Sequence, residues 1–251
     1  MARGTTKSTA GKRNTAVKKA TVIKKPEAAV LKNMPMPKKS TAARRSVARK
    51  KDAVATAMKP VNEWEIRCRQ MSAALQAEVR TVMFHCGGPL LWAGVPDFTN
   101  RVIPPMMLEQ ALQLVMTYHG SQIDKGGKPY VNHPKYVAGL FGNRPSYQLI
   151  ALMHDLLEDT DVTSQMLYMS YPPEVVTAVV ALTCGRYEAY DTYLERLCDP
   201  TRTPRYVLYV KLADMYHNLD ASRLVKFTET EVRRFEKYKR ALQKIRNALG
   251  C

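Results

Sequence analysis

The first 60 residues of this chain differ so sharply from the remainder that they limit what the molecule can fold into. Residues 1–59 hold 17 Lys/Arg against 2 Asp/Glu, and they contain no Phe, Tyr or Trp. Such a segment cannot bury enough apolar surface to offset the conformational entropy that it would lose on ordering. We therefore predict a disordered basic tail over residues 1–60, with the folded part beginning near Pro60.

The folded part is predicted to be helical almost throughout. Apolar residues recur there at the spacing of an amphipathic helix, and the signals for strands are weak. A helical extension of unknown role should occupy residues 61–103 and be followed by a main domain over residues 104–251, which gives an all-α fold. The predicted helices cover residues 61–84, 106–118, 135–141, 146–159, 163–169, 173–183, 187–197, 206–219 and 228–249.

Cysteine usage and hydropathy indicate the compartment. The cysteines are Cys68, Cys86, Cys184, Cys198 and Cys251. Their number is odd and none forms a CxxC pair, which argues against a disulfide framework and against a CxxC-type zinc site. No apolar segment is long enough to span a bilayer, and the start of the chain lacks the apolar core of a secretory signal. We therefore expect a soluble cytoplasmic protein with reduced thiols and no membrane partner.

Ionisable side chains that could hold a metal ion are concentrated in three short segments. They are His133, the adjacent pair His154 and Asp155, and the distant Asp214. An isolated His-Asp pair is usually no more than a hydrogen-bonded pair. Here the predicted helices carrying these groups are also rich in apolar residues, and ionisable groups on a packed helix are costly unless a cation compensates them. Imidazole and carboxylate together suit manganese, iron, cobalt, nickel or zinc better than calcium.

Two further carboxylates follow the His-Asp pair at a spacing that suits water chemistry. On one helix over residues 146–159, positions 154 and 158 share a side, as do positions 155 and 159. Glu158 and Asp159 would therefore lie beside the cation, where a carboxylate can order a water molecule and accept its proton. A bound cation lowers the pKa of that water and neutralises phosphate charge. The pattern predicts a metal-dependent phosphohydrolase.

The segment that carries Asp214 adds polar groups to the same helix. Asn218 lies one helical turn after Asp214, and Lys211 lies one turn before it. The apolar residues between them predict that this helix is packed as well. We interpret His217, in the same segment, as an ordinary packed histidine.

Taken together, these segments resemble the HD-domain hydrolases of the RelA/SpoT family, including the small stand-alone alarmone hydrolases. The similarity runs from about His119 to about Asp220. It is carried by the stretches HGSQIDKGGKPYVNHP (119–134), ALMHDLLEDT (151–160) and KLADMYHN (211–218). The resemblance implies a helical HD phosphohydrolase fold that holds one manganese ion, or another divalent transition metal.

The resemblance also implies a role for each matching residue. It implies that the metal ligands are His133, His154, Asp155 and Asp214, and that Glu158 and Asp159 activate the water. The residues that would face the nucleotide are Lys125, Lys211 and Asn218. The implied reaction removes the 3′-pyrophosphate of guanosine tetra- or pentaphosphate.

One position departs from the pattern of the family. Asp124-Lys125 stands where the family usually has Arg-Lys, and that arginine is expected to stack on the base and meet phosphate. An aspartate there loses the stacking plane and adds like charge near an anion. A related substrate therefore stays open as an alternative: NADPH, another 3′-phosphorylated nucleotide or a nucleoside triphosphate.

The basic tail gives a third alternative, from another class of protein. A segment with a net charge of +15 would bind nucleic acid through phosphate contacts that are independent of base sequence and sensitive to salt. The chain could then be a nucleic-acid-associated protein whose HD domain binds a nucleotide without catalysis. The complete ligand set with Glu158 and Asp159 argues for the enzyme. The oligomeric state does not follow from the sequence.

Overall fold

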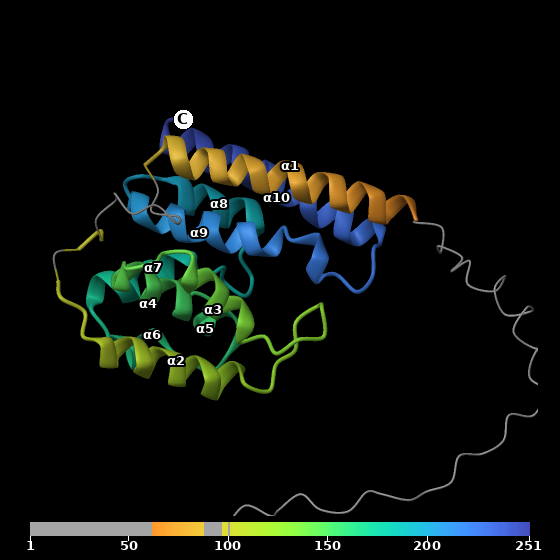
Figure 1. Cartoon of the computed structure of the whole chain (residues 1–251). Helices are drawn as coiled ribbons and strands as arrows, with labels where there is room; N and C mark the ends of the chain where they lie inside the picture. Colours follow the sequence, from red (N-terminus) through yellow and green to blue (C-terminus); the bar gives the residue numbers. More distant parts are fainter. Residues whose placement is uncertain (1–61, 88–96, 100) are drawn as a thin grey trace, which may run out of the picture. The chain divides into compact units, whose positions relative to one another are not determined.

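The computed structural model describes residues 62–87, 97–99 and 101–251 (Figure 1), so the predicted tail over residues 1–60 lies outside the described residues. Helices account for most of the described part, and its one β-type pairing is an isolated bridge between Ile123 and Pro129. The prediction of an all-α fold is confirmed. The elements are α1 (Glu63–His85), α2 (Pro105–His119), α3 (Asn132–Gly139), α4 (Pro145–Met153), α5 (Leu156–Asp159), α6 (Ser164–Tyr168), α7 (Pro173–Leu182), α8 (Tyr190–Cys198), α9 (Arg205–Asn218), the 3-10 helix η2 (Ala221–Arg223) and α10 (Glu229–Leu249).

Local sequence signals explain where several helices begin and end. Proline occupies the first turn of α2, α4 and α7, where its missing N–H has no intrahelical partner to lose. The side chain of Asn62 caps α1 by accepting a hydrogen bond of 2.7 Å from the backbone N–H of Glu65. At the other end of the chain, Gly250 terminates α10 in the left-handed conformation with φ 73°.

Helix α4 lies at the centre of the domain and packs against α2, α3, α7 and α9. Its residues from Leu149 to Met153 are all buried, as expected for a helix that is apolar around its whole circumference. Helices α3 and α9 also pack against each other. The C-terminal end of α4 therefore meets α3 and α9 inside the core, where the backbone has little freedom to move.

The prediction of one continuous helix over residues 146–159 is wrong at the pair His154 and Asp155. Helix α4 ends at Met153, and α5 begins at Leu156. Asp155 has φ −100° and ψ −6°, which turns the chain between the two helices. The backbone N–H groups of Glu158 and Asp159 then bond to the carbonyl oxygen of Asp155. The turn contains no glycine or proline, so no local signal in the sequence marks it.

The predicted extension over residues 61–103 contains α1, which packs along α10 and α9 (Figure 1). One face of α1 is buried, and it includes Cys68, Leu75, Val79 and Val82. At the end of this helix the carbonyl oxygen of Cys86 accepts hydrogen bonds from the side chains of two α9 residues, Arg205 and Tyr209. Helix α1 therefore shares its core with α9 and α10.

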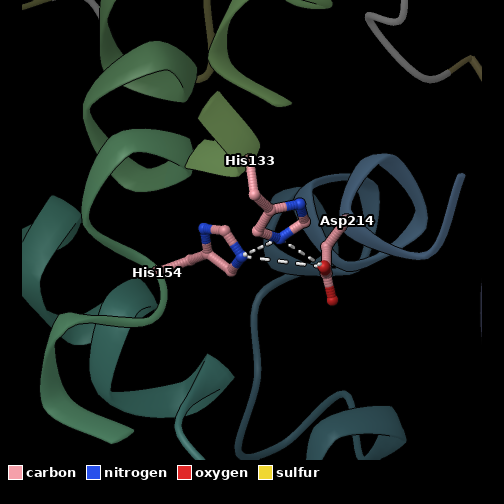
Figure 2. Close-up of side chains that lie close together, drawn as sticks. All are labelled: His133, His154 and Asp214. Atoms are coloured by element: carbon pink, nitrogen blue, oxygen red, sulfur yellow. Dashed lines mark hydrogen bonds and ion pairs between the residues drawn. The ribbon is translucent and has the colours of Figure 1, made fainter. Parts of the chain in front are cut away.

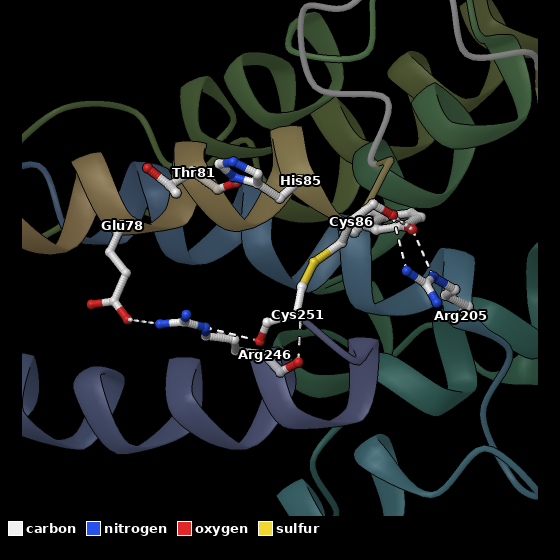
Figure 3. The surroundings of a disulfide bond; sticks show 8 residues. Glu78, Thr81, His85, Cys86, Arg205, Arg246 and Cys251 are labelled. Atoms are coloured by element: carbon white, nitrogen blue, oxygen red, sulfur yellow. Dashed lines mark hydrogen bonds and ion pairs between the residues drawn. A yellow bond between two sulfur atoms is a disulfide. The ribbon is translucent and has the colours of Figure 1, made fainter.

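The cysteines correct one expectation. Cys86 and Cys251 form a disulfide that joins the end of α1 to the chain after α10 (Figure 3), and their Cα atoms are 6.1 Å apart. The expectation that all the thiols are reduced is therefore wrong for this pair. A sequence separation of 165 residues hid the pairing, because only the parallel packing of α1 on α10 brings the C-terminal ends of the two helices together. Cys68, Cys184 and Cys198 are free thiols.

Within the described residues, no helix combines the length and the apolar character needed to cross a membrane.

Replacing Cys251 with Ser should lower the free energy of unfolding by about 2–4 kcal/mol, because the disulfide restricts the unfolded chain. The measurement is urea unfolding of both proteins, with and without a reductant. Cys198→Ser is the matched control, because Cys198 is unpaired. Identical midpoints for oxidised wild type and Cys251→Ser would contradict the contribution assigned to the disulfide.

Candidate metal centre

Two histidines and one aspartate converge where α3, the end of α4 and α9 meet (Figure 2). The Nε2 atom of His133 lies 3.2 Å from Nε2 of His154 and 3.1 Å from Oδ1 of Asp214. His154 Nε2 and Asp214 Oδ1 are 3.6 Å apart. All three residues are buried, with exposed fractions of 2–4%. Each one points a ligand atom at the same small volume.

The spacing of these atoms fits a single divalent cation. Two ligand atoms that each lie about 2.1 Å from one ion are about 3.0–3.4 Å apart in octahedral or tetrahedral geometry. The donor set of imidazole and carboxylate suits a transition metal. Asp155 adds a second carboxylate, since its Oδ2 lies 3.0 Å from Nε2 of His154 and 3.5 Å from Nε2 of His133. The structure thus brings together the four predicted ligands, three of them in one tight cluster.

Partners behind the ligands hold both imidazoles in the orientation that a metal requires. His154 donates from Nδ1 to the carbonyl oxygen of Ala151 at 2.8 Å, which leaves Nε2 free to bind an ion. The Nδ1 atom of His133 lies 2.6 Å from Nδ1 of His217. Burial, together with the charges of Arg223 and His133, lowers the pKa of His217 to about 3. When Nε2 of His133 binds a cation, its Nδ1 carries the proton, and a neutral His217 can accept a hydrogen bond from it.

His217 is packed, as predicted, but its pairing with His133 goes beyond an ordinary core position. Its ring stacks between His133, with ring centroids 4.9 Å apart, and Tyr136, with centroids 4.1 Å apart. The sequence signal was its place in the motif that carries Asp214. That signal did not show which face of α9 the ring would occupy.

The two polar neighbours of Asp214 on α9 hold its carboxylate in place. Lys211 donates to Oδ2 at 2.9 Å, and Asn218 donates to Oδ1 at 2.6 Å. Both were predicted to face a nucleotide. Their side chains do line the cavity described below, while each is bonded to Asp214. Lys211 therefore brings a positive charge both to the carboxylate and to the cavity wall.

The charged groups of the cluster shift one another's pKa values. Burial alone would lower the pKa of His154, but Asp155 and Asp214 raise that pKa well above its usual value. Burial alone would raise the pKa of Asp214, but Lys211 and the two histidines hold it well below its usual range. The carboxylates of Asp155 and Asp214 are therefore both ionised near neutral pH. A cation that binds here displaces the proton from His154, so its affinity should rise with pH.

Glu158 and Asp159 lie beside the cluster on α5. Oε2 of Glu158 accepts a hydrogen bond of 2.9 Å from the backbone N–H of Cys184. The hydroxyl of Tyr130 donates to Oδ2 of Asp155 at 2.5 Å and lies 3.4 Å from Oδ2 of Asp159. Burial raises the pKa of both Glu158 and Asp159, with the charge of Asp155 adding to the effect. A raised pKa makes a carboxylate a better proton acceptor.

These groups line a cavity of about 400 Å³. It adjoins a second cavity of about 390 Å³, and both are lined by Tyr130, Asn218, Lys237 and Tyr238. Sequence reasoning assigned no role to Tyr130, Lys237 or Tyr238. Tyr130 lies inside the matched segment and could have been found there. Lys237 and Tyr238 come from α10, which lies outside the matched segments.

The two remaining predicted residues line the second cavity. Lys125 is 60% exposed and lies 3.4 Å from a carboxylate oxygen of Glu231. Asp124 is not a free charge, because it forms an ion pair with Arg223 at 3.1 Å. The structure therefore separates the predicted set into a metal cluster, two adjacent carboxylates and a neighbouring nucleotide-sized cavity.

Comparison with known proteins finds sequence similarity to curated GTP pyrophosphokinases. No profile of a known protein family matches the chain. A probable GTP pyrophosphokinase of Mycobacterium leprae is 30% identical over 128 residues, which cover 47% of this chain and 16% of that protein. The GTP pyrophosphokinase rsh of Brucella ovis is 32% identical over 123 residues, covering 45% of this chain and 16% of that protein. The chain thus spans only a small part of the curated relatives it matches.

A solved structure has the same helical fold. It is described as "A metazoan ortholog of SpoT hydrolyzes ppGpp and plays a role in starvation responses". The TM-score is 0.50 at 21% identity, and the match covers 59% of this chain and 88% of that one. The chain is thus similar in sequence to part of these GTP pyrophosphokinases and in fold to this structure, which agrees with the resemblance seen in the motifs.

Replacing His217 with Phe should weaken the binding of Mn²⁺ by about 10–100-fold, because it removes the acceptor that orients His133. The aromatic ring keeps the stacking on Tyr136, which limits the change to the hydrogen bond. Isothermal titration of the purified protein with Mn²⁺ measures the affinity. His85→Phe is the matched control, since His85 is exposed on α1. Equal affinities of wild type and His217→Phe would contradict the orienting role.

Proposed function

We propose that this protein is a metal-dependent pyrophosphohydrolase that removes the 3′-pyrophosphate of guanosine tetra- or pentaphosphate. One observation carries the proposal: His154 and Asp214 of the cluster line the same cavity as Glu158 and Asp159. A purely nucleotide-binding module would have no use for carboxylates poised beside a set of metal ligands. The similarity to GTP pyrophosphokinases and to a ppGpp hydrolase supports this choice of substrate.

The residues of the chain divide the work as follows. A divalent cation held by His133, His154, Asp155 and Asp214 would neutralise phosphate charge and make a bound water more acidic. Glu158 and Asp159 hold the attacking water and accept its proton. The oxygen of that water bonds to the phosphorus next to the ribose, and the bond from this phosphorus to O3′ breaks. The products are pyrophosphate and a nucleotide with a free 3′-hydroxyl. Lys211, Lys125 and Asn218 would contact the phosphates.

The ion, the location and the alternative substrates follow from the same chemistry. The imidazole nitrogens and carboxylate oxygens of the site suit a divalent transition metal. We propose manganese among these, because the resemblance to the RelA/SpoT hydrolases implies it. We also propose the cytoplasm as the location. NADPH, other 3′-phosphorylated nucleotides and nucleoside triphosphates are the alternative substrates.

The purified protein with Mn²⁺ should release pyrophosphate from guanosine tetraphosphate. His154→Ala should abolish turnover, because it removes a metal ligand. Glu158→Gln should lower kcat by about 10²–10⁴-fold with little change in Mn²⁺ affinity, because it removes a proton acceptor and keeps the side-chain shape. A coupled pyrophosphate assay measures the rates, and EDTA should stop the reaction.

The control for these variants is Glu229→Gln, an exposed position on α10 that pairs with Arg233. It should keep the wild-type rate. Release of phosphate or pyrophosphate from NADPH or a nucleoside triphosphate alone would replace the proposed substrate. Bound metal with no turnover of any nucleotide would leave a binding module.

A second activity is favoured by the uneven charge of the chain. We propose that residues 1–59, with a net charge of +15, bind nucleic acid non-specifically through phosphate contacts. Deleting residues 1–59 should abolish binding to duplex DNA in a mobility-shift assay and leave pyrophosphate release unchanged. In the full chain the affinity should fall steeply between about 50 and 200 mM salt. DNA binding that survives the deletion would assign it to the folded domain.

A further inference from the structure

Asp124, which stands where the resemblance leads one to expect an arginine, forms an ion pair with Arg223. Asp124 is 8% exposed, and its Oδ1 accepts hydrogen bonds of 2.8 Å from the backbone N–H groups of Gly126 and Lys128. Its Oδ2 accepts from Nη2 of Arg223 at 3.1 Å. Burial alone would raise the pKa of Asp124, but these bonds lower it, so the carboxylate is ionised and neutralised in place. Asp124 therefore presents no free negative charge to a nucleotide.

Arg223 brings its guanidinium to the same place from a different part of the chain. It lies on η2, whose backbone sits directly against the turn that follows Asp124. A Cβ atom added to Gly126 would lie 2.5 Å from the carbonyl oxygen of Arg223, so only glycine allows this approach. An arginine thus stands beside position 124 although the sequence has none there.

The guanidinium of Arg223 is fixed at both ends. Its Nη1 donates to the carbonyl oxygen of His217 at 3.0 Å, and its Nη2 donates to Asp124. The side chain keeps 18% of its surface exposed and lines the 390 Å³ cavity next to the metal cluster. Two N–H groups of the guanidinium are engaged, and Asp124 balances its charge. A guanidinium can still stack on a planar ring through its face.

The other residues of this cavity supply what a nucleotide base and its phosphates need. Ile123 and Leu224, the chain neighbours of Asp124 and Arg223, provide apolar contacts. Lys125 and Lys237 carry amino groups that can meet phosphates. Since Lys237 also lines the cavity beside the metal cluster, the two cavities adjoin.

We propose that Arg223 is a specificity-determining residue that stacks on the purine base of the nucleotide. This inference rests on the proposed function, because it assumes that the nucleotide spans the two cavities. The inference also assigns a role to Asp124: its carboxylate fixes the orientation of the Arg223 guanidinium and does not contact the ligand.

The decisive variant is Arg223→Lys. Lysine can keep the ion pair with Asp124 but has no planar group, so a merely structural role would be rescued and a stacking role would not. Titrations in the presence of Mn²⁺ compare GDP with inorganic pyrophosphate, which has no base. We expect the affinity for GDP to fall about five- to tenfold and that for pyrophosphate and Mn²⁺ to stay unchanged. The KM for guanosine tetraphosphate should rise by the same factor at constant kcat.

Two further variants serve as a control and as a replacement for Arg223→Lys. Arg233→Lys, on the exposed face of α10, is the matched control and should match wild type in every titration. If Arg223→Lys does not fold, Arg223→Gln replaces it, with the same selective loss expected because an uncharged amide gives no cation–π attraction.

The outcomes separate the inference from the proposed function. Equal GDP affinity of wild type and Arg223→Lys, or an equal loss for GDP and pyrophosphate, would overturn the stacking role while pyrophosphate release could continue. No release of pyrophosphate from guanosine tetraphosphate, with GDP binding still dependent on Arg223, would overturn the proposed reaction and keep the base site. Wild type that binds no GDP would overturn the inference.

Discussion

The structure depends on the mutual compensation of charges that are buried at the end of α4. His154 and Asp214 are each 4% exposed, and His133 is 2% exposed. An isolated buried charge costs several kcal/mol, so each group must find an opposite charge or a cation within a few ångströms. Helices α3, α4 and α9 pack in an arrangement that brings these groups together, surrounded by apolar contacts.

This requirement extends outward through a ring of hydrogen bonds. Each ligand has a partner that fixes its rotamer: the carbonyl of Ala151 for His154, His217 for His133, and Lys211 with Asn218 for Asp214. Such partners keep a site ordered before it binds its ion or substrate. The paired Asp124 and Arg223 extend the same principle to the neighbouring cavity, since a buried carboxylate there holds a cation in a fixed plane.

Sequence alone predicted the helices well, because long apolar patterns with proline starts carry strong local information. Helix α10, for example, was expected over residues 228–249 and is observed over Glu229–Leu249. The three buried residues that converge, His133, His154 and Asp214, could also be named, since they lie in short matched segments. The turn at Asp155 was missed because its backbone is set by packing and not by a turn residue. Arg223 and Lys237 were missed because only the folded chain brings them near the site.

The disulfide between Cys86 and Cys251 changes the covalent topology of the molecule. Every helix from α2 to α10 lies between these two residues, so the bridge turns most of the domain into one closed ring. A protease that cuts once inside the ring cannot release a fragment, because both new ends stay attached through the sulfur atoms. A nicked molecule would run as a single species until it is reduced. In an oxidised molecule the candidate metal ligands His133, His154 and Asp214, which all come from inside the ring, therefore stay covalently connected by two routes.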